Sequence, residues 1–426
     1  MIIMKKIIIP VLVFVASASF AQVNSELNGL VKQSLTYFPK IQELTTTEEI
    51  SSMRVDVARS NYLPNLNATG TYNYVNPVGQ VQFPVSATET KTLQFQPHDN
   101  YNFNVGLNQQ IWDFGRTRAQ IEKSKNDLLV AHANTESARL QVAAQVATIY
   151  YGMIYLKKSI EVQDSVVAYY ANNKKIVEGK IRQGDALQLD LSTIENNIDQ
   201  ETNRKVEFQR QYARQVALLR YTTGHATEPS QNTFDFQATP TSDFSGNPDL
   251  QAATQRIAAA QSDIRLSSSN RFPSLSFQAS SGYKNGYQPD INEMRFNVLA
   301  GATLTFPIYQ GGRVRQNLTI ARKSAELSEI SKNNTLATLT KDLESVQADL
   351  KAYDQQIKNS EGQITVAKET SRLTQVRYKQ GVATYLDLVS ASTNLQRANL
   401  NRIQYEYQRT LALIENCRLT GVRFWE

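Results

Sequence analysis

The prolines of this chain are placed unevenly, and their placement limits how the chain can fold. In the 426-residue sequence no proline lies between Pro97 and Pro229, and none follows Pro307. Because proline interrupts helix interiors, both proline-free stretches can be helical over more than a hundred residues. A compact globular domain seldom contains such stretches without turns. The sequence therefore predicts very long helices rather than two or three compact domains.

The composition argues against several classes of function. Cys417 is the single cysteine, so it forms neither an intrachain disulfide nor a cysteine-cluster metal site, and the 3 histidines share no ligand spacing. Neither a Gly-rich phosphate loop nor a nucleophile elbow is present. The 45 basic and 39 acidic residues are interspersed, which gives nucleic-acid binding little support. We expect no catalytic residues, no metal site, no cofactor and no nucleic-acid partner.

The N-terminal residues indicate export. Lys5 and Lys6 precede an apolar segment at 7–14, and small residues lead to Ala21. This pattern predicts a signal peptide at 1–21. The alternative is a short membrane anchor, for which the apolar segment is too short. The remaining chain has no apolar run long enough for a transmembrane helix, so any membrane span must be built from β-strands.

The sequence is internally duplicated. Pro64 and Pro273 are 209 residues apart in similar surroundings, and further along the offset becomes 197. The matching pairs at the second offset include Gly184 with Gly381 and Asp190 with Asp387. We predict a first repeat at 22–224, a linker at 225–247 and a second repeat at 248–426. Repeats of this length are too long for solenoid units and indicate a duplicated half-protein.

Each repeat is predicted to contain a helix, a strand, a loop, a strand, a long helix, a turn and a return helix. Val142, Val146, Ile149 and Met153 step alternately by four and three residues, which is typical of a coiled-coil seam. At 1.5 Å per residue each long helix would span roughly 100 Å. The predicted helices lie at about 24–61, 114–182, 185–221, 249–270, 311–379 and 384–419, and the strands at about 65–75, 101–112, 274–284 and 294–308.

Each predicted strand is near the length that crosses a bilayer when tilted, and the strands alternate apolar and polar residues. Aromatic residues such as Tyr72, Trp112 and Tyr283 lie near the strand ends. A soluble β-sandwich edge is the competing interpretation. Four strands cannot close a barrel, and open edges cannot face lipid. Strands must therefore be shared between chains, with eight strands from two copies or twelve from three.

Several duplicated motifs carry a family resemblance. They are the strand starts at Pro64 and Pro273, the strand-to-helix junction around Pro307, and the segment 377–388. Together and in this order they resemble the TolC family of outer-membrane efflux channels. The resemblance implies an internally duplicated α+β membrane protein. Each chain of a homotrimer would contribute four strands to a 12-stranded β-barrel, and its long coiled-coil helices would form an α-helical barrel.

The resemblance also implies a location and partners. The protein would lie in the cell outer membrane, in contact with outer-membrane lipid, and extend into the periplasm. It would be the passive exit duct of a tripartite efflux or type I secretion system. Its partners would be a periplasmic adaptor (membrane fusion) protein and an inner-membrane transporter that supplies the energy.

The resemblance assigns roles to the two predicted turns. The turns would form the periplasmic tip and dock the adaptor through Gly184, Asp185, Ala186, Gly381, Val382 and Ala383. By themselves, the glycines indicate helix C-caps, with Asp185 or Thr384 starting the next helix.

A pore constriction and gate is the second implied site. It would comprise Asp190, Asp387 and Tyr378, with Tyr378 hydrogen-bonded to Asp190 in the closed state. From the residues alone, both aspartates are simply exposed acids near helix N-termini. The family's best-known member has an arginine and a third aspartate where this chain has Ala383 and Ser390. Only Asp190, Asp387 and Tyr378 are therefore assigned to the gate.

Two other classes of protein compete with an export duct. The first is a trimeric coiled-coil surface or structural protein with a β-barrel anchor, which predicts one anchor and no duplication. The second is a secreted enzyme, which the lack of clustered catalytic residue types and the great helix lengths argue against.

Overall fold

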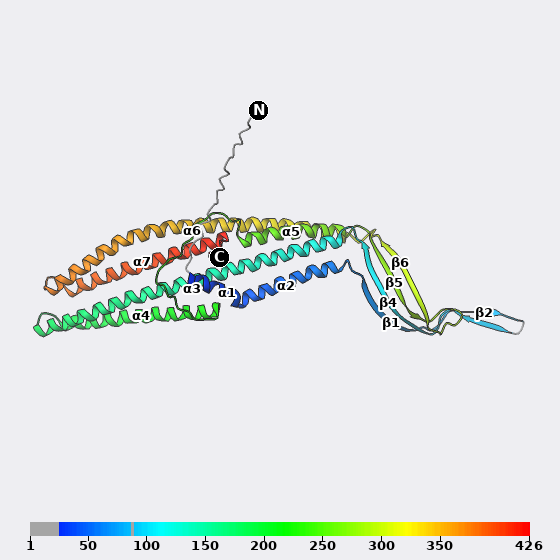
Figure 1. Ribbon diagram of the computed structural model, residues 1–426, viewed down its shortest axis with the longest axis horizontal. Helices are drawn as coiled ribbons and strands as arrows, with labels where there is room; N and C mark the ends of the chain where they lie inside the picture. Colours follow the sequence, from blue (N-terminus) through cyan, green and yellow to red (C-terminus); the bar gives the residue numbers. More distant parts are fainter. Residues whose placement is uncertain (1–24, 87–88) are drawn as a thin grey trace, which may run out of the picture. The chain divides into compact units, whose positions relative to one another are not determined.

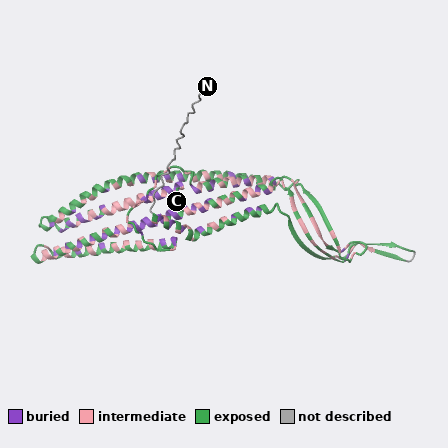
Figure 2. Ribbon diagram, viewed as in Figure 1, coloured by how far each residue is buried: buried purple, intermediate pink, exposed green. Residues whose placement is uncertain are grey.

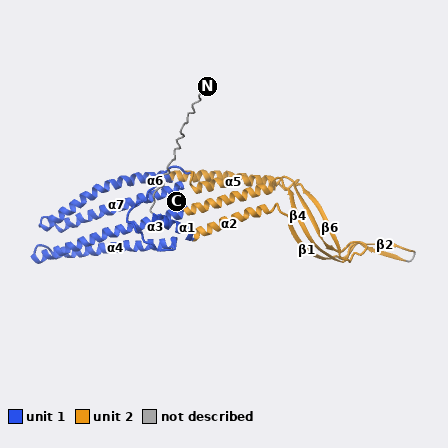
Figure 3. Ribbon diagram, in the orientation of Figure 1, with its two compact units in different colours: residues 1–38, 140–244, 342–426 blue, residues 39–139, 245–341 orange. Residues whose placement is uncertain are grey.

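A computed structural model describes residues 25–86 and 89–426, so the predicted signal peptide at 1–21 lies outside the described residues (Figure 1). The chain divides into two compact units (Figure 3). Unit 1 comprises residues 1–38, 140–244 and 342–426, and unit 2 comprises residues 39–139 and 245–341. Each unit draws on both halves of the sequence. Among the described residues, no helix has both the length and the apolar character needed to cross a membrane.

Unit 2 contains a four-stranded antiparallel sheet with the order β1-β4-β5-β6 (Figure 1). A bulge between Gln110 and Trp112 shifts the register of β4 against β5. No other strand of the described chain pairs with the outer edge of β1 or of β6. The strands are β1 (Asn65–Tyr74), β4 (Asp99–Trp112), β5 (Ser274–Lys284) and β6 (Arg295–Thr305).

Most residues of the outer strands β1 and β6 are exposed in the single chain (Figure 2), and apolar residues of the sheet are among the exposed ones. Phe103 and Val105 of β4 are each 55% exposed, and Phe296 and Val298 of β6 are 61% and 66% exposed. Each pair is two residues apart, so its members share a face of the sheet, as the alternating sequence predicts. An outward apolar band is the surface that a membrane strand presents to lipid.

The segment 75–100 differs from the expected loop. It contains a hairpin of β2 (Gln80–Pro84) and β3 (Thr90–Gln94), which form a separate two-stranded sheet. The apolar alternation of Val81, Phe83 and Val85 covers only these few positions and has Pro84 within it. So short a run beside prolines gives a weak strand signal, which is why the prediction was wrong here.

The predicted helix at 24–61 was also wrong, because two helices occupy this segment. They are α1 (Ser25–Tyr37) and α2 (Pro39–Ser60), and Phe38 separates them. Proline has no backbone N–H and is well placed at the first position of a helix, so Pro39 starts α2 instead of continuing α1.

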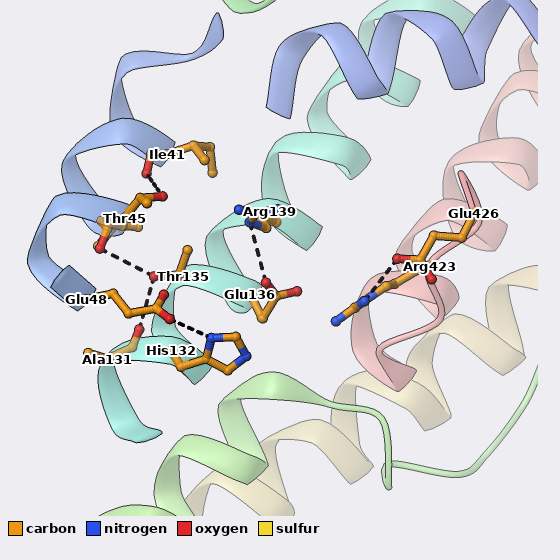
Figure 4. A network of polar contacts seen from close by, with 11 residues as sticks. Ile41, Thr45, Glu48, Ala131, His132, Thr135, Glu136, Arg139, Arg423 and Glu426 are labelled. Carbon is orange, nitrogen blue, oxygen red and sulfur yellow. Dashed lines mark hydrogen bonds and ion pairs between the residues drawn. The ribbon is translucent and has the colours of Figure 1, made fainter. Parts of the chain in front are cut away.

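The helices of unit 2 are joined by polar contacts. They are α2, α5 (Pro248–Ser269) and the unit 2 parts of α3 (Arg116–Gln183) and α6 (Arg313–Lys379). Glu48 Oε1 of α2 lies 2.9 Å from His132 Nδ1 of α3 (Figure 4). Ser137 of α3 donates a 2.6 Å hydrogen bond to Asp249 of α5. These bonds connect α3 to the helices from both halves of the sequence.

Unit 1 contains α1, α4 (Gln188–Thr223), α7 (Tyr385–Thr420) and the remaining parts of α3 and α6. The predicted seam is its core, because Val142, Val146, Ile149 and Met153 are all 5% exposed or less. The segment 225–247 has neither helix nor strand. Its Phe236 is buried, with its ring 5.3 Å from that of Phe424.

One polar cluster interrupts the apolar core of unit 1. It consists of Gln163 of α3, Glu201 of α4 and Gln396 of α7, each 6% exposed or less. The Gln396 amide donates to Gln163 Oε1 at 3.1 Å and to Glu201 Oε2 at 2.7 Å, and Gln163 also donates to the Glu201 carboxylate. Because every partner is hydrogen-bonded, this Gln163–Glu201–Gln396 cluster ties three helices together without leaving a buried polar group unpaired.

We predict that Gly282→Ala disrupts the sheet of unit 2. A Cβ atom at Gly282 would lie 2.0 Å from the Phe103 carbonyl oxygen and 2.6 Å from Asn104 Cα, and both are backbone atoms of β4. Such overpacking costs roughly 1–3 kcal/mol. Gly301→Ala is the matched control, since a Cβ there meets nothing within 4 Å. The measurement is the yield of folded protein in the outer membrane, and equal yields of both variants would contradict the prediction.

Candidate functional site

Two helical hairpins of unit 1 end in matching turns. The first turn joins α3 to α4 around Gly184, and the second joins α6 to α7 around Gly381. The two glycines have φ values of 80° and 77°, a left-handed conformation that favours glycine. In the first turn Asp185 N donates to Lys180 O and Gly184 N to Ile181 O, and in the second Val382 N donates to Arg377 O and Gly381 N to Tyr378 O. Both turns are therefore Schellman motifs.

The carboxylates of Asp190 and Asp387 cap the helices that follow these turns. Asp387 Oδ2 accepts from Thr384 N at 2.8 Å and from Thr384 Oγ1 at 2.7 Å, and the Thr384 hydroxyl accepts from Asp387 N. These reciprocal bonds form a capping box. Asp190 Oδ2 accepts from Leu187 N at 3.2 Å, but Leu187 has no side-chain oxygen to return a bond. Hydrogen bonds from Thr384 lower the pKa of Asp387 below its ordinary value.

The structure corrects the expected start of the first return helix. Asp185 was predicted to begin it, but Leu187 is the N-cap and α4 starts at Gln188. Asp185 is exposed and belongs to the turn, because its N–H closes the Schellman motif. In the second hairpin Thr384 is the N-cap, as expected.

Tyr378 lies near Asp190 without bonding to it. Burial, and then the charge of Asp190, raise the pKa of the Tyr378 hydroxyl. In the described part of the chain these two residues share no hydrogen bond, so the expected Tyr378–Asp190 bond is absent from this conformation. The Tyr378 side chain instead packs in a cluster of five buried residues: Val177, Ile194, Tyr378, Tyr385 and Leu388.

Lys180 connects the two hairpins beside this cluster. Its ammonium group donates to the Tyr378 carbonyl at 2.9 Å and lies 4.9 Å from the centre of the Tyr378 ring. This places a cation against the last turn of α6, where the helix dipole is negative. Asn197 of α4 adds a second connection by donating a 3.2 Å hydrogen bond to the Tyr385 hydroxyl of α7. Burial raises the pKa of Tyr385 to about 12, so this tyrosine is neutral at physiological pH.

Sequence reasoning missed Lys180, Tyr385 and Asn197. A usable signal existed for Lys180, because Lys180 and Arg377 occupy the same position of the two repeats, four residues before the turn glycines. A cation in the last turn of a helix favours its C-terminus. Asn197 and Tyr385 are far apart in sequence, so only the packing of α4 on α7 brings them together.

Exposed aliphatic side chains surround the turns. Leu187 and Leu189 are 67% and 69% exposed, and Val382 and Leu386 are 64% and 73% exposed. Ala186 and Ala383 are half-buried and pack against the apolar cluster below. The two tips therefore have a polar, hydrogen-bonded frame and an apolar outer surface.

The three prolines assigned to strand boundaries belong to unit 2, away from the tip turns in the sequence. Pro64 and Pro273 directly precede β1 and β5, and Pro307 follows β6 by two residues. Aromatic residues gather near the loop end of the sheet, where the Tyr72 and Tyr101 rings are 5.2 Å apart and the Tyr283 and Phe296 rings are 5.7 Å apart.

We predict that Leu187→Thr stabilises the start of α4 by supplying the hydroxyl missing from its capping box. An N-cap hydroxyl contributes about 1 kcal/mol, so amide exchange at Asp190 should become several-fold slower. Thr384→Ala is the matched opposite, and it should speed exchange at Asp387 by a similar factor. Unchanged exchange in both variants would show that the caps do not control the helix starts.

Comparisons with known proteins identify the family. The family described as "Outer membrane efflux protein" matches residues 30–225 and 244–422. Nodulation protein T of Rhizobium leguminosarum bv. trifolii is 20% identical, with 91% of this chain and 84% of that protein covered. Outer membrane protein OprJ of Pseudomonas aeruginosa is 22% identical, with 94% and 84% covered.

A solved structure shows the same fold. The outer membrane protein VceC of Vibrio cholerae matches with a TM-score of 0.78 at 18% identity, with 93% of this chain and 96% of that chain covered. The family match spans most of the sequence. This chain therefore belongs to the outer membrane efflux protein family, and it is an efflux channel protein of the cell outer membrane that extends into the periplasm.

Proposed function

We propose that this protein is a homotrimeric, passive exit duct that works with a periplasmic adaptor and an inner-membrane transporter. The open-edged sheet of unit 2 carries the proposal. Its outer strands β1 and β6 have no partner for their outer edges in the described chain, yet its apolar side chains are suited to lipid. Unpaired backbone groups cost several kcal/mol each in hydrocarbon, so strands of further copies must pair with both edges. Three copies give twelve strands, enough for a lumen.

The tips of the two hairpins are proposed to dock the adaptor. Gly184, Asp185, Ala186 and Gly381, Val382, Ala383 form the turns, and exposed Leu187, Leu189, Val382 and Leu386 surround them. Exposed aliphatic side chains at matching positions offer apolar area to a partner protein. The proposed role needs no catalytic residue, and the family consists of transport channels. We infer that the protein is not an enzyme and that the transporter supplies the energy.

Asp190 and Asp387 are proposed to line the pore constriction, with Tyr378 behind them. The capping bonds use Oδ2 of each carboxylate. Oδ1 of each has no hydrogen-bond partner among the described residues, so it can face the pore. Three copies would form two acidic rings, which favour cations and repel anions. Lys180 and Tyr378 are proposed to hold adjacent hairpins together when the channel is closed.

We predict that the double variant Asp190→Asn, Asp387→Asn forms channels with higher conductance or weaker block by divalent cations in planar bilayers. The amides keep one hydrogen-bonding oxygen but remove the charge that attracts cations. Glu195→Gln is the control. Glu195 also carries one negative charge on α4, but it pairs with Lys174 of α3 within the hairpin. Pore formation with unchanged conductance and block would contradict the constriction. Failure to form any pore by the natural protein would contradict the duct.

Block of the channel by divalent cations should also persist to unusually low pH. Because hydrogen bonds from Thr384 lower the pKa of Asp387 in the folded protein, its carboxylate stays charged below the ordinary aspartate range. Its capping contribution is complete above the ordinary pKa and is lost as the pH falls through the lowered value. In the Thr384→Val variant, block by divalent cations should be lost at a higher pH than in the natural protein. An identical pH dependence in the two proteins would contradict this assignment.

We predict that Lys180→Met raises single-channel conductance by loosening the contact between hairpins. The substitution removes the donor to the Tyr378 carbonyl and the cation over its ring. Lys175→Met is the control, because Lys175 is exposed on the same helix and loses the same charge. Equal conductance of the two variants would show that Lys180 does not restrain the closed tip.

A further inference from the structure

The bulge in β4 places an aromatic residue on the apolar face of the unit 2 sheet. Phe103 of β4 pairs with Tyr283 of β5. Beyond the bulge, Trp112 pairs with Leu275. Leu275 and Tyr283 are an even number of residues apart on one strand, so they and their partners share a face. Trp112, which is 60% exposed, therefore lies on the face that carries Phe103 and Val105.

A row of ring contacts leads from Trp112 toward the helices that adjoin the sheet. The Trp112 ring lies 5.9 Å from the Phe114 ring, and the Phe114 ring is stacked on that of Phe272 at 5.6 Å. Phe272 comes just before β5, and the guanidinium of Arg271 lies 4.9 Å from the centre of its ring. The row thus begins on the apolar face of the sheet and ends at a cation.

The backbone at Phe114 is in a conformation that is rare for a bulky residue. Its φ is 52°, in the left-handed region that favours glycine. The carboxylate of Asp113 fixes this turn, because it accepts from Gly115 N at 3.1 Å and from Thr117 N at 2.7 Å. Strain of this kind persists where the surrounding structure holds it, and it is common at binding surfaces. Here the strained turn carries the Phe114 ring to Phe272 and leaves the Asp113 carboxylate occupied.

Phe114 and Phe272 also line a cleft between the start of α3 and the end of α5. The cleft has a volume of about 460 Å³, and its other lining residues include Arg118, Glu122 and Arg265. The side chains of Arg118 and Arg265 lie 3.6 Å and 3.1 Å from the Glu122 carboxylate. They are nevertheless 80% and 61% exposed, so both guanidinium groups can reach a further partner.

Positive charge exceeds negative charge in and beside this cleft. Arg118 and Arg265 share the carboxylate of Glu122. Arg271 is exposed, and its guanidinium has no ion pair or hydrogen bond with any described residue. The planar guanidinium group binds phosphate oxygens through paired N–H donors and also stacks on aromatic rings. Three arginines beside two stacked phenylalanines are therefore suited to a ligand that joins a phosphate to an apolar body.

We propose that this cleft binds the phosphate of an anionic phospholipid from the inner leaflet of the outer membrane. Arg118, Arg265 and Arg271 would hold the phosphate, and the acyl chains would lie along Trp112 and the apolar face of the sheet. Because the protein extends from the membrane into the periplasm, the strand ends that join α3 and α5 are assigned to the periplasmic side of the bilayer. The inference goes beyond the proposed duct, which needs no particular lipid.

The second strand-to-helix junction offers a matched control. The repeat offset of 197 aligns Phe114 with Gly311 and Arg118 with Arg315. Gly311 supplies no ring, and Arg315 is exposed and does not line the cleft. Arg315→Gln therefore removes the same charge at the equivalent position of the other repeat without altering the cleft.

Tryptophan fluorescence tests the site. The chain has 2 tryptophans, Trp112 and Trp425, so Trp425→Phe leaves Trp112 as a reporter next to the cleft. The protein is reconstituted in phosphatidylcholine vesicles that contain a minor fraction of dibrominated phosphatidylglycerol or, separately, of dibrominated phosphatidylcholine. Bromine quenches a nearby indole, so the ratio of the two quenching levels measures the preference for anionic lipid. We expect phosphatidylglycerol to quench Trp112 several-fold more effectively than phosphatidylcholine.

Substitutions in the cleft should shift this preference in opposite directions. Arg118→Gln together with Arg271→Gln should remove most of the preference, whereas Arg315→Gln should leave it unchanged. Glu122→Gln should increase it, because the Glu122 carboxylate competes with phosphate for Arg118 and Arg265. A purely structural role of these residues would not raise the preference in any variant. Circular dichroism of each variant checks that the helices remain folded.

The outcomes separate the lipid site from the duct. Equal quenching by the two lipids in the Trp425→Phe protein would overturn the lipid site. An unchanged preference in the double arginine variant, or an equal loss in Arg315→Gln, would overturn it as well. Conductance of the same preparations is measured in planar phosphatidylcholine bilayers. Channels that conduct without a lipid preference overturn only the lipid site, and a lipid preference in a protein that forms no pores contradicts only the duct.

Discussion

Unsatisfied backbone hydrogen bonds at the edges of one sheet determine the rest of this structure. The order β1-β4-β5-β6 leaves the two outer strands each with one edge unpaired in the single chain. In lipid such edges must be paired, and in the proposed trimer the neighbouring copies would supply the pairing strands. Any assembly that closes the sheet also brings the helices of different copies together, so their facing surfaces must be compatible.

Long-period features were predictable from the sequence, and short or non-local ones were not. The proline gaps and the seam through Val146 extend over many turns, so they indicated α3 and α6 clearly. The hairpin of β2 and β3 has five residues in each strand, too few for alternation to stand out. The break at Phe38 depended on Pro39, whose effect at a helix start differs from its effect inside a helix.

The candidate site was predictable in its positions but not in its bonds. The turn glycines and the two aspartates were located from the duplication, and the capping role of Asp387 agrees with its place after Thr384. The absence of a Tyr378–Asp190 bond could not be predicted, since Lys180 reaches Tyr378 from α3, which is far away in the sequence, and the contact of Tyr385 with Tyr378 depends on the geometry of the turn between them. The half-complete capping box at Leu187 shows that the two tips are related in backbone geometry more closely than in side chains.

The Gln163–Glu201–Gln396 cluster has a consequence for how the gene can have evolved. In the first half the position equivalent to Gln396 is Asp199, so a copy of the first half in place of the second would bring a carboxylate against Glu201 and Gln163. A copy of the second half in place of the first would leave the Gln396 amide facing the equivalent residues Ser360 and Ala398, so it would lose both of its hydrogen bonds. The two halves have thus diverged into complementary partners. Exchanging one half for the other would therefore remove hydrogen bonds that join α3, α4 and α7.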